Sequence, residues 1–199
     1  MITRGSRQIT VTSNSREHTL EVKEFSVRRS PRNLPAHLKA CSGKTALAQI
    51  CLNETVCHLL HIYSLNKLPA AFVILLSHPK VKLVGVNIKN DVWKLGRDFK
   101  EFPAQKVVEN NCMDSGTFAN KVLNRSCRWS LEKLTAYLLK KRIDKNSKVR
   151  MSKWHIHPLS EEQKNYAATD AYVSWLLHTV IQKKADEKST EEKMNCQNV

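Results

Sequence analysis

The sequence predicts an α/β domain in which a mixed sheet is flanked by helices. Apolar residues make up 41% of the 199 residues and charged residues 26%, a balance typical of one globular domain of ordinary size. Two apolar runs, 45–51 and 56–62, are separated by a link of hairpin length, which indicates two antiparallel strands. From residue 68 onward, helix-type and strand-type patterns alternate, which favours a sheet covered by helices.

Local patterns place the remaining elements. Short apolar runs predict strands at 81–87 and at Val107–Val108. Apolar spacing near 3.6 residues predicts helices, and the expected ranges are 68–77, 91–99, 115–123, 130–140 and 160–183. Pro69 suits the first turn of the first of these helices, and Ser160 with Gln163 forms a capping box at the start of the last one.

The chain divides into three parts. Residues 1–42 show only short alternating runs broken by prolines, so we expect an atypical basic N-terminal arm that is poorly ordered. Residues 43–183 form the domain, and the charged residues 184–199 are expected to be a disordered tail. There is no apolar run of about 18 residues, so we expect no contact with a membrane, and no secretory signal is expected at the N-terminus.

The six cysteines are spread along the chain without a Cys-x-x-Cys pair, so we interpret them as reduced intracellular thiols. Cys51 and Cys57 are expected to fill the core. Cys57, His58 and His61 could suggest zinc, but on a strand the two histidines point to opposite faces, which disfavours a metal site.

Positive charge is concentrated in one internal stretch. The formal net charge is +15, and residues 120–155 carry 11 Lys and Arg against 2 Asp and Glu. A solvated helix face with a basic loop would explain this. A surface that binds the phosphates of a nucleic acid strand is the more specific interpretation. It is favoured because the planar side chains of Trp129 and Trp154 alternate along the sequence with Arg128 and Arg150. Nucleic acid is therefore a plausible partner.

Asp170 is the most informative anomaly in the last helix. It falls on the same helix face as the apolar stripe and lies four residues after Tyr166. A carboxylate facing the core is costly unless it is paired or binds a metal. It could be an acid at the edge of the stripe that is paired with a lysine or a backbone donor, or it could be a metal ligand with the Tyr166 hydroxyl one turn away.

Asp91 follows the strand expected at 81–87, at the start of a helix. In that place an acid is favourable simply as an N-cap or first-turn residue. The end of a strand is also where α/β sheets present groups that bind ligands. If Asp91 and Asp170 face one cleft, they become two oxygen ligands of a Mg²⁺ or Mn²⁺ site.

Three segments resemble the Werner-type 3′–5′ exonuclease domain: VGVNIKNDVWKLGRDF (84–99), RWSLEKLTAYLLKK (128–141) and KVRMSKWHIHPLSEEQKNYAATDAY (148–172). GKTALAQIC (43–51) resembles the second strand of that family. The family belongs to the DnaQ-like, RNase D-related group with an Asp-Glu-Asp-Asp-Tyr active site. The likeness spans roughly residues 43–183 and is strongest to free-standing insect-type exonucleases, which lack a fused helicase. It implies an RNase H-like mixed sheet flanked by helices.

The resemblance also implies an activity, the stepwise release of nucleoside monophosphates from a DNA 3′ end with two Mg²⁺ or Mn²⁺ ions. Asp170 matches the acid that binds the more buried ion, and Asp91 matches the acid that supports the metal site through water. Tyr166 matches the residue that positions the attacking water. The residues we expect to hold the strand are Trp93, Arg128, Lys140, Lys141, Arg142, Arg150 and Lys153.

The first motif of the family, a strand carrying Asp-x-Glu, is absent. Counting back from Gly43, Pro31 occupies the position of the Asp and Asn33 that of the Glu. Neither is an anionic ligand, and a proline disfavours a central strand. No Asp precedes Asp91 in the chain. We therefore expect the first strand of the fold to be degraded or missing, and this chain to have little or no nuclease activity.

Three explanations of this gap stay open. Residues 1–42 could come from an alternative or mis-joined exon in front of a true exonuclease domain. The chain could be a non-catalytic relative that still binds DNA ends. A different glutamate could complete the site in a rearranged N-terminus. An enzyme and a DNA-binding module are thus both compatible with the sequence.

Cellular context follows from the expected substrate. A protein that acts on DNA ends is expected in the nucleus, in DNA repair, replication or genome maintenance, and Arg28, Arg29 and Arg32 could assist import. Because no helicase is fused to such a domain, a separate helicase acting in trans is a possible partner.

Overall fold

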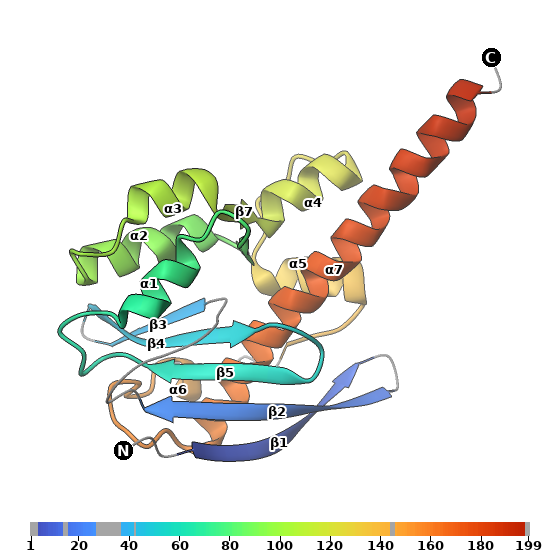
Figure 1. Ribbon diagram of the computed structural model, residues 1–199. Helices are drawn as coiled ribbons and strands as arrows, with labels where there is room; N and C mark the ends of the chain where they lie inside the picture. The colour runs from blue at the N-terminus through green and yellow to red at the C-terminus, as the bar shows by residue number, and fades with distance from the viewer. Residues whose placement is uncertain (1–3, 14–15, 27–36, 42, 144–145, 198–199) are drawn as a thin grey trace.

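The computed structural model describes residues 4–13, 16–26, 37–41, 43–143 and 146–197, with side chains from residue 43 to 143 and from 146 to 194 (Figure 1). Its main sheet has the strand order β1-β2-β5-β4-β3. The strands are β1 (Arg4–Ser13), β2 (Arg16–Ser26), β3 (His37–Cys41), β4 (Lys44–Cys51) and β5 (Val56–His61). β2 runs parallel to β5 and every other pair is antiparallel, so the predicted mixed sheet is confirmed.

A second, two-stranded sheet follows along the chain. β6 (Leu83–Gly85) and β7 (Cys112–Asp114) pair in parallel. Parallel strands need a crossover connection, and α2 (Ile88–Asp98) and α3 (Ala104–Asn110) supply it here. This arrangement places the start of α2 directly after the carboxyl end of β6.

Helices cover both faces of the main sheet. In Figure 1, α1 (Ala70–Leu76), α2 and α3 lie together on one side of it, and the long helix α7 (Glu161–Gln197) crosses it and extends well beyond the rest of the chain. The other described helices are α4 (Ser115–Leu123), α5 (Leu131–Leu139) and α6 (Ser147–Arg150).

β4 is buried on both faces. From Thr45 to Cys51 every residue is buried, because Leu47 and Cys51 join the core under α7 while Ala48 and Ile50 join the core under α1, α2 and α3. The continuous burial of this strand reflects its position between two helical layers.

The side chain of Asp98 ties α2 to the start of β4. Its Oδ2 accepts hydrogen bonds from the Thr45 backbone N–H (2.6 Å) and hydroxyl (2.6 Å) and from Lys94 Nζ (3.0 Å). Lys94 also donates to the Gly43 carbonyl. Burial opposes ionisation of this carboxyl, but the bonds from Thr45 and Lys94 outweigh it and lower the pKa of Asp98.

Several predicted elements are confirmed. The hairpin of 45–51 and 56–62 corresponds to β4 and β5, and the helices expected over 115–123 and 130–140 correspond to α4 and α5. In the predicted capping box, the Ser160 N–H donates to Gln163 Oε1 (2.9 Å) and the Gln163 N–H donates to Ser160 Oγ (3.2 Å). Cys51 and Cys57 are buried free thiols, as expected for core residues.

The strand predicted at Val107–Val108 is wrong. These residues belong to α3, which begins after Pro103 and buries Ala104, Val107 and Val108 on one face. A spacing of three and four residues fits a helix, whereas a pair of valines taken alone suggested a strand. The second strand of the small sheet is instead β7, whose three half-buried residues give no clear sequence signal.

The two ends of the chain differ from the expectation. Most of 1–42, expected to be a poorly ordered arm, contains β1, β2 and β3. Hydrogen bonding organises this segment although its own alternation is weak, because β2 pairs with β5, β1 pairs with β2 and β3 pairs with β4. Residues 184–197, expected to be disordered, continue α7. Pairs one turn apart support this part of the helix, among them Gln182–Asp186 (2.9 Å) and Lys183–Glu187 (4.0 Å).

Within the described residues, no helix has the length and hydropathy needed to cross a membrane.

The Asp98 interaction predicts a pH-dependent contribution to stability. Because the folded-state pKa of Asp98 is lowered, the carboxylate stabilises the fold above its unfolded pKa of about 4, and this contribution is lost as the pH falls through the folded pKa. Asp98→Asn is therefore expected to lose about 1–3 kcal/mol at pH 7 in urea unfolding. The difference from the unsubstituted chain should shrink below about pH 4.

Asp186→Asn is the matched control, because Asp186 lies on the exposed part of α7. It should change the free energy of unfolding by less than about 0.5 kcal/mol. An Asp98→Asn effect that is equally small, or that persists unchanged at acid pH, would contradict this role of Asp98.

Candidate functional site

Asp170 is buried in the middle of α7, with an exposed fraction of 9%. Around it α7 is buried on more than one face, through Ala167, Ala168, Ala171 and Tyr172. Small alanine side chains let the helix approach the sheet closely, so that the Cys57 thiol donates to the Ala168 carbonyl across 3.9 Å. The sequence analysis predicted the burial of Asp170 from a stripe of large residues and missed the alanines that produce the close approach.

Tyr166 lies one turn before Asp170 and is half-buried. Its ring packs near Trp154, with 6.2 Å between the ring centroids. The tyrosine and the aspartate therefore lie on one face of α7, as predicted.

The loop before α7 fixes the start of this helix. Trp154 is 1% exposed, its Nε1 donates to the Arg150 carbonyl (3.0 Å), and its own carbonyl lies 3.0 Å from His61 Nε2 on β5. Gln163 Nε2 donates to Ser152 Oγ (2.9 Å). These contacts, with the capping box, set the position of Tyr166 and Asp170 relative to the sheet.

Asp91 lies in the first turn of α2 and is half-buried. Ile88, Val92 and Leu95 form the buried face of this helix. A first-turn acid is favourable at a helix N-terminus, so the simpler interpretation of Asp91 holds whether or not it also binds a ligand. α2 and α7 both pack on β4 and β6, so Asp91 and Asp170 are carried by two helices that share the same strands.

Asp114 is a residue that the sequence analysis missed. Its Oδ2 accepts a hydrogen bond from the Asn87 N–H (2.6 Å), and its Oδ1 accepts one from the Thr117 N–H (2.8 Å). It caps α4 and at the same time holds Asn87, the left-handed residue (φ 61°) that precedes α2. An Asp directly before a helix and three residues before a Thr is the sequence signal of such a cap.

Pro31 and Asn33, which stand where the resemblance requires acids, lie outside the described residues. Within the described part, no three His, Cys, Asp or Glu side chains are grouped so that they could hold a metal ion.

Most of the basic residues expected to hold the strand lie on the surface. Arg128 precedes α5, the Lys140–Arg142 cluster follows it, and Arg150 and Lys153 lie at and after the end of α6. All of these are exposed except Lys141, which is half-buried. Lys140 Nζ and the Arg125 guanidinium lie 5.2 Å and 5.0 Å from the centre of the Tyr137 ring.

The predicted interleaving of tryptophans with these charges is wrong. Trp154 belongs to the core, where its large apolar area is worth more than on the surface. Trp129 is half-buried, with its Nε1 donating to Asn120 Oδ1 (2.7 Å) and its ring packed on Tyr137. Trp93, the aromatic residue that was expected to hold the nucleic acid strand, is 49% exposed.

Comparison with known proteins agrees with this fold. In sequence, a 3′–5′ exonuclease from Drosophila melanogaster is 45% identical over 158 residues, which is 79% of this chain and 44% of the relative. The chain thus spans less than half the length of that relative.

In structure, Brucella melitensis NrnC superposes with a TM-score of 0.63 over 87% of this chain and 85% of NrnC, at 17% identity. Forms of NrnC have been solved with bound Mg²⁺ and bound to pGG. Escherichia coli RNase D gives a TM-score of 0.57 at 15% identity, over 83% of this chain and 40% of RNase D. These similarities confirm the predicted RNase H-like fold.

The sequence model of the 3′–5′ exonuclease family matches residues 36–186. This match covers most of the chain, including the helices that carry Asp91 and Asp170. The chain belongs to the 3′–5′ exonuclease family, a family of nucleases that hydrolyse phosphodiester bonds.

Proposed function

We propose that this domain binds the 3′ end of a DNA strand beside Asp91, Tyr166 and Asp170, and that its hydrolysis of that end is strongly impaired. The observation that carries the proposal is the position of Asp170, buried on α7 one turn after Tyr166, in a chain that belongs to an exonuclease family. Asp91, Tyr166 and Asp170 occur in the order and spacing of the site residues that the resemblance to the exonuclease family implies.

Divalent ions are the cofactor that the resemblance implies, and Asp170 and Asp91 are the oxygen donors that Mg²⁺ or Mn²⁺ would use. Two ions bound for in-line displacement need more carboxylates than these. Pro31 and Asn33 have none. No group of three metal-binding side chains occurs among the residues that the structure describes. The donor set does not fit a two-ion site, and this is the reason for proposing impaired hydrolysis.

DNA binding is supported by charge. The exposed cations from Arg125 to Lys153 lie on α5, α6 and the loops beside them, with few acids among them. Phosphate contacts supply most of the affinity of proteins for nucleic acid strands. Lys140, Lys141 and Arg142 are the densest part of this surface and therefore its best test.

An active exonuclease is the second candidate. It is favoured by the family match over 36–186 and by the presence of Asp91, Tyr166 and Asp170 in their expected order. It would require that carboxylates from another part of the protein complete the site. For either candidate we propose a nuclear role in DNA repair, replication or genome maintenance, with a separate helicase as a possible partner.

The first prediction concerns turnover. Incubated with Mg²⁺ or Mn²⁺, the chain 1–199 is expected to leave a 5′-labelled, 3′-recessed DNA duplex intact while it shifts the duplex on a native gel. Because Asp170 is buried and is not a phosphate contact, Asp170→Asn should alter the Kd for this duplex by less than about threefold. A ladder of shorter products that disappears in Asp170→Asn would instead establish an active exonuclease.

The second prediction concerns the basic surface. Neutralising Lys140, Lys141 and Arg142 together with glutamine should weaken binding to single-stranded DNA. The slope of log K against log salt should fall by about 2, since each lost phosphate contact removes about 0.7. Fluorescence anisotropy at several salt concentrations measures both quantities.

The control for this variant removes the same charge elsewhere. Lys184, Lys188 and Lys193 are exposed on the far part of α7 and are changed to glutamine together. An equal loss of slope in this control would show that net charge, and not the surface beside α5, sets the affinity.

A further inference from the structure

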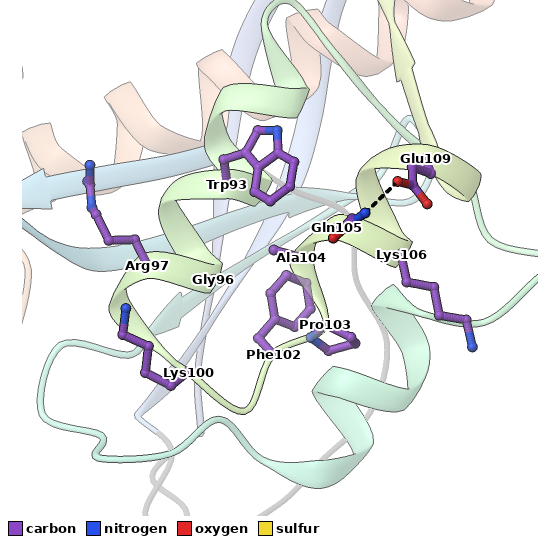
Figure 2. Close-up of a pocket in the computed structure, with 10 residues that line it drawn as sticks. All are labelled: Trp93, Gly96, Arg97, Lys100, Phe102, Pro103, Ala104, Gln105, Lys106 and Glu109. Atoms are coloured by element: carbon purple, nitrogen blue, oxygen red, sulfur yellow. Dashed lines mark hydrogen bonds between the residues drawn. The ribbon is translucent and has the colours of Figure 1, made fainter.

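An open groove lies between α2 and α3, on the side of α2 that faces away from the sheet. It has a volume of about 640 Å³ (Figure 2). Trp93, Arg97 and Lys100 reach it from α2 and the turn after it, and Phe102 and Lys106 from α3 and its approach. Figure 2 shows the Trp93 ring at one end of the groove, above Phe102, with Arg97 and Lys100 along the α2 side.

The groove and the candidate site lie on opposite faces of α2. Trp93 and Arg97 are four residues apart, so they lie on the same face of the helix. Asp91 precedes Trp93 by two residues, which places it about 160° around the helix axis from Trp93. The groove is therefore a surface separate from the site at Asp91 and Asp170.

The floor of the groove is apolar and rigid. A Cβ atom at Gly96 would lie 2.3 Å from the Cβ of Ala104, so the absence of a side chain at Gly96 allows α2 and α3 to meet there. Phe99 and Phe102 are buried and pack the turn between the two helices. A ligand that enters the groove thus meets a preformed surface, which lowers the entropic cost of binding.

Positive charge surrounds this floor. Lys100 and Lys106 are exposed and make no ion pair with a described residue. The Arg97 side chain is 66% exposed, with its Nε 3.7 Å from an oxygen of Asp98. The acid that lines the groove, Glu109, accepts a hydrogen bond from Gln105 (3.0 Å). The groove thus presents three cations to a ligand, against one acid.

Trp93 adds a large apolar surface above the floor. It is 49% exposed although Val92 and Leu95 give α2 a buried face. Tryptophan and arginine are among the residues that most often dominate the binding energy of protein interfaces, in which an apolar centre is surrounded by a polar rim. The groove has this anatomy on a small scale.

These features fit a peptide better than a nucleic acid strand. A single strand is held by aromatic rings on which successive bases stack and by cations that follow its phosphates. Of the two aromatic residues that line the groove, Phe102 is buried and Trp93 is open to solvent, so a row of stacked bases has only one ring. An apolar side chain can fill the floor, and carboxylates beside it are the natural partners of the arginine and the lysines.

We propose that the groove between α2 and α3 is a docking site for an acidic segment of a partner protein. An apolar side chain of that segment is held between Trp93 and Phe102, and its carboxylates pair with Arg97, Lys100 and Lys106. The inference does not rest on the proposed function, because it concerns the opposite face of α2. A partner bound there leaves Asp91 accessible.

The test uses fluorescence anisotropy with the chain 1–199 and two labelled peptides. One has a pair of leucines flanked by aspartates and glutamates, and the other has serines in place of the leucines. The leucine peptide should bind about tenfold more tightly. Trp93→Ala should remove most of this difference, and Trp93→Phe should keep much of it. Neutralising Arg97, Lys100 and Lys106 together with glutamine should raise the Kd of both peptides about tenfold.

The glutamine variant of Lys140, Lys141 and Arg142 is the matched control, because it loses the same charge from the surface beside α5. It should change the Kd of the leucine peptide by less than about twofold. An equal loss of affinity in this control, equal affinity for the two peptides, or binding of neither would overturn the inference. If an unlabelled DNA strand of equal charge displaces the leucine peptide as effectively as the unlabelled peptide does, the groove is a site for nucleic acid, and the inference is likewise wrong.

Discussion

The burial of β4 on both faces is the constraint on which the rest of this domain depends. A strand with no solvent-facing side must be covered twice, so one helical layer packs on Ala48 and Ile50 and another on Leu47 and Cys51. The first layer contains α2 and the second contains α7. The two helices that carry the candidate site residues are thus positioned by the same eight-residue strand.

Hydrogen bonds fix the orientation of the helices that hydrophobic packing brings to the sheet. Hydrophobic packing is not directional, so it brings α2 near β4 without fixing its rotation. The bonds from Thr45 and Lys94 to Asp98 supply that direction at the carboxyl end of α2. At the other layer, the capping box and the buried Trp154 fix the start of α7. α2 is thus oriented by hydrogen bonds at its carboxyl end, seven residues after Asp91, and α7 by hydrogen bonds at its start, before Tyr166 and Asp170.

Sequence patterns predicted the elements whose signals are local. The hairpin, the helix from Ser115 and the Ser160–Gln163 capping box depend on residues close together in the chain, and the structure confirms them. Asp170 was identifiable because a charge on an apolar helix face is anomalous at any position.

What sequence reasoning missed depends on tertiary contacts. Val107 and Val108 are helical and lie in the buried face of α3, and Trp154 is buried in the core beneath α7, where its Nε1 donates to the Arg150 carbonyl. β1 and β2 have weak alternation of their own: β2 pairs with the edge of β5, and β1 pairs with β2. The groove beside Trp93 exists because Gly96 and Ala104 are small, and two small residues eight positions apart give no signal until the helices meet.

The single carboxylate of Asp114 joins the segment before α2 to the start of α4. One of its oxygens holds the backbone entering α2, and the other holds the first turn of α4. A displacement of α4 would therefore act on Asn87, which lies four residues before Asp91. The start of α2 and the start of α4 are thus coupled through one side chain, and removing its carboxylate would release both.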